Sequence, residues 1–107
     1  MYSISTNISN TYINIGGDNQ AKNFQLLTSD FSIDENNKII SIIKNAVSKY
    51  SKYRDIAHFI HEQCQKSFSG KWTISVGGRD NIFCHTSSDR VLGCNIGSYK
   101  IVVNYCA

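Results

Sequence analysis

The stretch IAHFIHEQCQKSFSGKWTISV, residues 56–76, changes its hydrophobic period at Gly70, and this change decides the fold. Before Gly70, apolar residues recur every three or four positions, which predicts an amphipathic helix. After Gly70, Trp72, Ile74 and Val76 alternate with polar residues, which predicts a strand with one buried face. The apolar positions of the helix are Ile56, Phe59, Ile60, Cys64 and Phe68.

A first helix is expected upstream of this stretch. Ser32-Ile33-Asp34-Glu35 has the pattern of a capping box, in which the serine and glutamate side chains bond each other's backbone amides. We expect Ser51 to cap the second helix, and Gly70 to supply the left-handed residue that ends it. A short apolar run, 24–27, predicts a strand before the first helix. The apolar stripe of the first helix consists of Ile39, Ile40, Ile42, Ile43, Ala46, Val47 and Tyr50.

Three further strands are expected near the C-terminus, over residues 82–86, 91–96 and 99–105. The last two flank Gly97-Ser98, a two-residue loop typical of a β-hairpin, because glycine supplies the positive φ of a type II′ turn. Residues 77–80, Gly-Gly-Arg-Asp, are expected to form a turn. The order is strand, helix, helix and four strands. This predicts an α+β fold in which two helices pack on an antiparallel sheet.

Length and composition narrow the class of protein. A chain of 107 residues and 12.0 kDa predicts one domain. The hydrophobic fraction of 41% and charged fraction of 18% exclude a disordered tail, and a net charge of +3 is too small for a dedicated nucleic-acid binder. No apolar run is long enough to span a membrane. We expect residues 1–22 to form a flexible polar extension, with a short strand near 12–15, and residues 23–107 to form the domain.

The four cysteines, Cys64, Cys84, Cys94 and Cys106, include no CxxC pair, and no signal-peptide pattern precedes them. We therefore expect free thiols in a reducing, cytoplasmic compartment. Under oxidation, Cys84 and Cys94 could pair across strands.

Histidine and cysteine also invite catalytic and metal-binding interpretations. His58, His61 and Cys64 share one helix face, but three ligands on one helix leave a tetrahedral metal site incomplete. Cys84 and His85 are neighbours on a predicted strand, so their side chains point to opposite faces, which favours a structural role over a nucleophile and base. We expect no cofactor, no metal and no enzymatic activity.

A cluster of basic residues leaves two interpretations open. It is either a solvated helix surface or a surface for an acidic partner, and the salt dependence of binding distinguishes them. The cluster comprises Lys44, Lys49, Lys52, Arg54, Lys66 and Lys71.

Several spaced motifs occur together in one register. They are Tyr50, Arg54-Asp55-Ile56-Ala57, Lys71-Trp72, Val76-Gly77 and Ile96-Gly97. Together these motifs resemble the homodimeric, peptide-binding type of dynein light chain, as opposed to the Tctex or roadblock types. The resemblance runs without a gap from about Phe24 to Ala107.

This resemblance implies a two-fold homodimer in which the strand 82–86 crosses to the partner subunit. It also implies that an extended client peptide, such as a segment of dynein intermediate chain, adds to that strand in each of two grooves, by β-augmentation. The partners would be a second copy and the client, with no nucleic acid and no membrane. The expected location is cytoplasmic, on the microtubule cytoskeleton.

Carried over position by position, the resemblance assigns a groove and an interface. Two groove tyrosines of the family are replaced by Gly93 and Asn95, and an apolar wall residue by Asp80. A one-residue shift at Gly77-Gly78 would align Arg79 with an arginine of the family, but both flanks match the ungapped register. The expected groove residues are Tyr53, Arg54, Arg79, Asp80, Asn81, Ile82, Phe83, Cys84, His85, Thr86, Gly93 and Asn95. The expected dimer interface contains Thr73, Ile82, Phe83, Cys84 and His85.

These departures predict that the family's usual Thr-Gln-Thr peptide binds weakly or not at all, and that another motif is preferred. Thr73 stands where the family has an interface histidine linked to acid dissociation, so we expect no such dissociation here. The alternative is a structural axonemal or cytoskeletal subunit with diverged grooves, or a heterodimer with a paralogue. A cysteine/histidine redox or zinc enzyme is a third class, which metal analysis of the purified protein tests.

Overall fold

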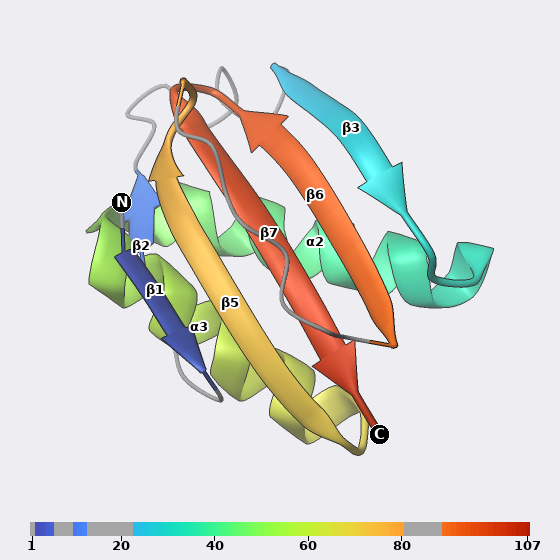
Figure 1. Cartoon of the computed structure of the whole chain (residues 1–107). Coiled ribbons are helices and arrows are strands. Elements are labelled where there is room, and N and C mark those ends of the chain that lie inside the picture. The colour runs from blue at the N-terminus through green and yellow to red at the C-terminus, as the bar shows by residue number, and fades with distance from the viewer. Residues whose placement is uncertain (1, 6–9, 13–22, 81–88) are drawn as a thin grey trace.

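The computed structural model describes residues 2–5, 10–12, 23–80 and 89–107. Over these residues the chain is an α+β domain with two helices on one face of an antiparallel sheet, as the sequence predicts (Figure 1). The elements are β1 (Tyr2–Ser5), β2 (Asn10–Tyr12), β3 (Phe24–Ser29), α2 (Ile33–Lys49), β4 (Tyr50–Lys52), α3 (Tyr53–Ser67), β5 (Lys71–Gly78), β6 (Arg90–Ile96) and β7 (Tyr99–Cys106).

The main sheet has five described strands in the order β1-β5-β7-β6-β3, all antiparallel to their neighbours. β6 and β7 form the predicted hairpin, in which Ile96 pairs with Tyr99. Gly97 in its loop has φ of 58°, the positive value that the Gly-Ser pattern requires. Gly77 and Gly78 continue β5 and pair with β7, so the expected turn at 77–80 begins only after them.

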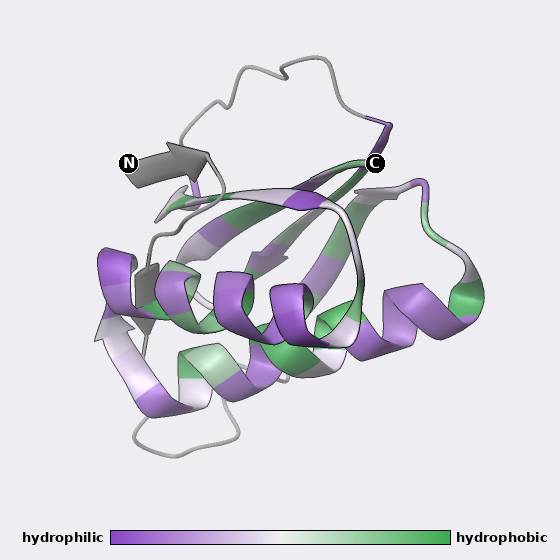
Figure 2. Ribbon diagram, turned by 90° about the horizontal axis from the view of Figure 1, so that it is seen from below, coloured by the Kyte–Doolittle hydropathy of each residue, from purple (hydrophilic) through white to green (hydrophobic). Residues whose placement is uncertain are grey.

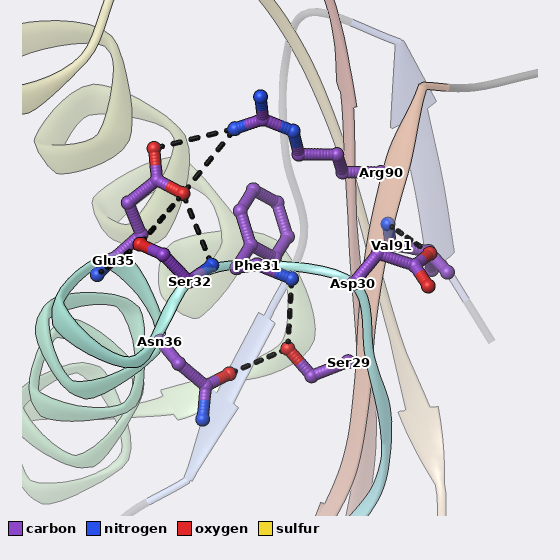
Figure 3. Close-up of polar contacts among 8 residues, drawn as sticks. All are labelled: Ser29, Asp30, Phe31, Ser32, Glu35, Asn36, Arg90 and Val91. Atoms are coloured by element: carbon purple, nitrogen blue, oxygen red, sulfur yellow. Dashed lines mark hydrogen bonds and ion pairs between the residues drawn. The ribbon is translucent and has the colours of Figure 1, made fainter.

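Helix α2 begins with the predicted capping box (Figure 3). The Glu35 amide donates to Ser32 Oγ at 3.3 Å, and the Ser32 amide donates to Glu35 Oε1 at 3.2 Å. Arg90, at the start of β6, donates to the same carboxylate at 3.2 Å. The box therefore fixes the start of α2 and also ties it to the sheet.

The turn between β3 and α2 is also fastened to β6. The Asp30 amide donates to the Val91 carbonyl at 2.9 Å, and the Val91 amide donates to Asp30 Oδ2 at 3.1 Å. Ser29 Oγ donates to Asn36 Oδ1 at 2.6 Å and accepts from the Phe31 amide (Figure 3). These bonds satisfy polar groups that would otherwise be left unpaired where the chain turns from strand to helix.

Helix α3 differs from the prediction at both ends. Its N-cap is Lys52, with no side-chain capping bond, so the expected Ser51 cap is wrong, because residues 50–52 form β4 instead. Its C-cap, Phe68, is extended. Gly70 does have a positive φ of 98°, but it lies beyond the cap and faces the Tyr105 ring, where a Cβ would come within 2.3 Å of Cε1. Gly70 therefore allows the close approach of β7 and does not end the helix.

The core lies between the sheet and the two helices. Both helices carry hydrophobic and hydrophilic residues in alternating bands, as amphipathic helices do (Figure 2). Each fully buried aliphatic side chain contributes roughly 1.5–3 kcal/mol through burial. The core residues that are essentially unexposed are Ile39, Ile43, Ala46, Val47, Ile56, Ala57, Ile60, Cys64, Trp72, Ile74, Val76, Leu92, Cys94, Ile96, Ile101 and Val103.

Residues 1–22 contain two described strands. β1 pairs with β5 (Figure 1). β2 pairs with β4 in a second, two-stranded sheet. The strand expected near 12–15 overlaps β2 only at Tyr12, and residues 13–15 lie outside the described residues. The sequence did not predict β1.

Candidate functional site

The start of α3 offers backbone donors to a ligand. The first amides of a helix have no partner within the helix, and Lys52 at the N-cap makes no side-chain capping bond to them. Arg54 in the first turn is exposed, so a cationic side chain lies beside these amides. A hydrogen-bond acceptor, such as an amide or carboxylate oxygen, suits this position.

Tyr53 joins the start of α3 to one end of the sheet. Its ring packs edge-on against Tyr99, with centroids 5.7 Å apart, and its hydroxyl would lie 3.5 Å from a Cβ at Gly78. Tyr99 in turn donates from its hydroxyl to the Ser51 carbonyl at 3.4 Å. The predicted groove residue Tyr53 therefore lies beside the end of β5, and Arg54 follows it in the first turn of α3.

Arg79 and Asp80 follow β5 and are both exposed. The Arg79 amide donates to the Ser98 carbonyl at 3.0 Å, and its guanidinium donates to the Gly97 carbonyl at 2.8 Å. A weaker contact of 3.4 Å reaches Gln25 on β3. Arg79 thus fastens the end of β5 across the β6–β7 hairpin. Asp80 is brought to the same end of the sheet.

The centre of the predicted groove lies outside the described residues. It comprises Asn81, Ile82, Phe83, Cys84, His85 and Thr86. Their assignment to the swapped strand, and of four of them to the dimer interface, stays a prediction.

Gly93 and Asn95 lie on the other face of the sheet. Their neighbours Leu92, Cys94 and Ile96 are fully buried against the helices, so the alternation of a strand turns Gly93 and Asn95 away from the helices. Within one chain the structure therefore does not bring these two residues together with Tyr53 and Arg54, which belong to α3.

The face that carries Asn95 also carries other buried polar side chains. Asn95 is 9% exposed, and its Oδ1 has no hydrogen-bond partner among the described residues. Ser75 and Asn104 are also buried polar residues, and Thr73, expected at the dimer interface, is partly buried and pairs with Asn104. Polar side chains are therefore buried on the face of the sheet that points away from the helices.

The histidine and cysteine residues of α3 have ordinary structural surroundings. His58 forms an ion pair with Glu62 one turn on. Burial, and then the nearby His58, lowers the pKa of His61, while Glu62 acts in the opposite direction. Burial raises the pKa of Cys64 to about 12, which makes it a neutral thiol of the core. In the described part of the chain, no three His, Cys, Asp or Glu side chains gather as a metal site.

Cys94 is also a core thiol. It is fully buried on β6, and burial raises its pKa to about 12 against a smaller opposing effect of a backbone hydrogen bond to Ile101. Cys64, Cys94 and Cys106 form no disulfide with one another, and Cys84 lies outside the described residues.

Sequence reasoning missed the strand that lies along β5. β1 runs beside β5 (Figure 1). In its register, Tyr2 is opposite Val76 and Ile4 is opposite Ile74. The signal was present in the alternation Tyr-Ser-Ile-Ser, which has the period of a strand, but it covers only residues 2–5 of a polar region.

Comparison with known proteins places most of the chain in one protein family. Residues 23–104 match the family model described as dynein light chain type 1. No curated protein matches the chain. None of the described helices is long and apolar enough to cross a membrane.

Proposed function

This chain belongs to the dynein light chain family, and on that premise we propose that it is a non-catalytic, dimeric hub for an extended client segment. The client, such as a segment of dynein intermediate chain, would add a strand to the segment 82–86 contributed by the partner subunit. Main-chain hydrogen bonds would supply affinity and side-chain pockets specificity. Two grooves on one dimer would hold two client chains side by side, which raises their effective concentration.

The path of the chain from β5 to β6 carries this proposal. These strands are not neighbours, because β7 lies between them, and both are antiparallel to β7. Gly78 pairs with Tyr99 at one end of β7, whereas Arg90 pairs with Tyr105 at the other, about 20 Å away at the rise of a strand. The connection must bridge this length. A tight hairpin loop cannot do so, whereas an extended segment can, and we propose that this segment contains the strand 82–86.

The start of α3 supports the same proposal. The first turn of α3, which has no side-chain cap from Lys52 and carries the exposed Arg54, begins with Tyr53 beside Gly78 at the end of β5. A client strand added to the segment 82–86 could direct an acceptor side chain to the first amides of α3. Gly93 and Asn95 lie on the opposite face of their own chain, so a groove that includes them requires two subunits.

The replaced groove residues favour a changed peptide motif. An exposed carboxylate at Asp80 replaces an apolar wall, and Gly93 provides no side chain at all. We therefore propose that Thr-Gln-Thr peptides bind more weakly than micromolar, and that a cationic residue in the client suits Asp80.

A structural role is the second candidate, and one observation favours it. β1 already pairs with β5, so a strand of the same chain fills part of an edge that could otherwise accept a strand from another chain. In that case the protein would be an axonemal or cytoskeletal subunit with unused grooves, or a heterodimer with a paralogue.

Selection from a library of extended peptides tests the proposal, followed by calorimetric titration of the selected peptide and of a Thr-Gln-Thr peptide. We expect the selected peptide to bind at one per chain and the Thr-Gln-Thr peptide to give little heat. If no peptide is selected, the structural role replaces the hub. Tight binding of Thr-Gln-Thr would contradict the changed motif.

A further inference from the structure

The edge of β5 has an occupant from its own chain. β1 runs antiparallel to β5 and pairs with Thr73, Ile74, Ser75 and Val76. Without β1, β5 would be the edge of the sheet, with a row of unpaired main-chain groups beside fully buried core residues. Such an edge accepts strands readily.

The hydrogen bonds of β7 show which main-chain groups of β5 face β1. The Arg79 amide donates to the Ser98 carbonyl, so the main-chain N–H and C=O of Arg79 point toward β7. By the alternation of an antiparallel ladder, the main-chain groups of Gly77, Ser75 and Thr73 also point toward β7. The main-chain groups of Ile74 and Val76 therefore face the other way, toward β1. β7 supports this assignment. The Tyr105 carbonyl accepts from the Asp89 amide, so the main-chain groups of Tyr105 point toward β6 and those of its neighbour Asn104, which pairs with Thr73, point toward β5.

The register then identifies the donors of β1. Ile4 stands opposite Ile74 and Tyr2 opposite Val76, so their main-chain groups pair with β5. The amides of Ser3 and Ser5 point away from it. β1 consequently binds β5 through alternate residues. A substitution that removes the Ile4 amide therefore removes a main-chain hydrogen bond to β5, whereas removal of the Ser3 amide does not.

A second attachment holds the same segment beside the start of α3. β2 pairs with β4, in which Tyr12 stands opposite Tyr50, and it lies against α2 and α3. β4 leads directly into Tyr53 and Arg54. β1 and β2 thus lie at the edge of β5 and beside the start of α3, respectively.

We propose that Tyr2–Ser5 is an intramolecular occupant of the β5 edge, which a strand from a second copy must displace before the dimer forms. This inference rests on the proposed function for the role of the second copy. β1 covers only four of the eight residues of β5. A longer incoming strand would make more main-chain bonds than it removes, so β1 weakens self-association without preventing it.

A pair of proline variants of the full chain tests the occupancy. Ile4→Pro removes an amide that faces β5, whereas Ser3→Pro removes one that faces away, where a strand edge tolerates proline. Amide hydrogen exchange is measured at low protein concentration. We expect the Ile74 and Val76 amides to exchange roughly tenfold faster in Ile4→Pro than in the wild type, and Ser3→Pro to resemble the wild type.

Equal exchange in the two variants would overturn the occupancy. Wild-type protection of Ile74 and Val76 that is lost on dilution would overturn it too, because the strand would then come from another molecule. This readout needs no client, so it is independent of whether any peptide binds.

Sedimentation equilibrium of the same variants tests the competition. We expect Ile4→Pro to self-associate at least about threefold more tightly than Ser3→Pro, because its β5 edge is open. Equal dissociation constants would overturn the competition. If neither the wild type nor the two variants bind any library-selected peptide, that result would instead count against the proposed function.

Discussion

The uncapped start of α3 predicts a gain of stability from one substitution, Lys52→Ser. Lys52 has φ of −99° and ψ of 140°, an extended conformation like that of Ser32, which caps α2. Asp55 occupies the third position of α3, as Glu35 does in α2. A serine at 52 could therefore accept from the Asp55 amide and build a second capping box.

The expected gain is about 1 kcal/mol, the usual difference between a serine and a non-capping residue at an N-cap. In a domain of this size it raises the melting temperature by roughly 4–8 °C. Lys52→Ala is the matched control, because it removes the lysine and its other interactions without supplying a cap. The measurement is urea unfolding at one fixed chain concentration, since dimer stability depends on concentration.

The same substitution links stability to binding. If the client supplies a hydrogen-bond acceptor to these amides, the serine hydroxyl of Lys52→Ser competes with it for the same amide. Peptide binding should then be roughly 2- to 10-fold weaker than in Lys52→Ala. The reasoning is refuted if Lys52→Ser unfolds at the same urea concentration as Lys52→Ala, because the first amides of α3 would then already have hydrogen-bond acceptors.

Four further results are expected. Ser32→Ala should cost about 1 kcal/mol by urea unfolding, whereas Ser48→Ala, an exposed hydroxyl that donates only to a carbonyl of its own helix, should be nearly neutral; equal losses would contradict the role of the capping box. Cys94 should resist alkylation in the folded protein and react after unfolding, because burial raises its pKa to about 12; rapid native labelling would show that β6 opens. Glu35 has a pKa held below its ordinary value of 4.5, chiefly by the Ser32 amide, so its stabilisation is present above that value and lost as the pH falls through the lowered pKa. The melting temperatures of wild type and Glu35→Gln should therefore converge with acidification, and a constant difference would refute this. Because Thr73 is not titratable, light scattering should show no loss of dimer in the histidine range, and dissociation there would contradict the assignment.

The elements with a local chemical signal could be predicted from the sequence. The capping box before α2 and the Gly-Ser loop between β6 and β7 act within a few residues, and the structure confirms both. The helical and strand periods on either side of Gly70 also gave α3 and β5, because each element buries one face against the other.

Other features depend on contacts between distant segments. Ser51 looks like a cap, but residues 50–52 pair with β2 as a strand, so Lys52 takes the cap position. β1 is only a four-residue alternation, and its place is set by the open edge of β5 some seventy residues later in the chain. Gly70 looks like a helix C-cap, whereas its actual neighbour is the ring of Tyr105.

The candidate site could be predicted only in part. Tyr53 packs beside the end of β5, and Asp80 follows that strand, whereas Gly93 and Asn95 lie on the opposite face of the sheet. The role of these residues in a groove stays a prediction. A groove formed by two subunits cannot be assembled from the periodicity of one chain, because strand exchange places residues of different copies together. The assignment of residues 81–86 therefore rests on the family resemblance.

The mass of the peptide complex tests the central claim most directly. Sedimentation equilibrium of the chain with a library-selected peptide should give a complex of two chains and two peptides, because the client adds to a strand that has crossed between subunits. A complex of one chain with one peptide would contradict the account, since each groove would then be built within a single subunit.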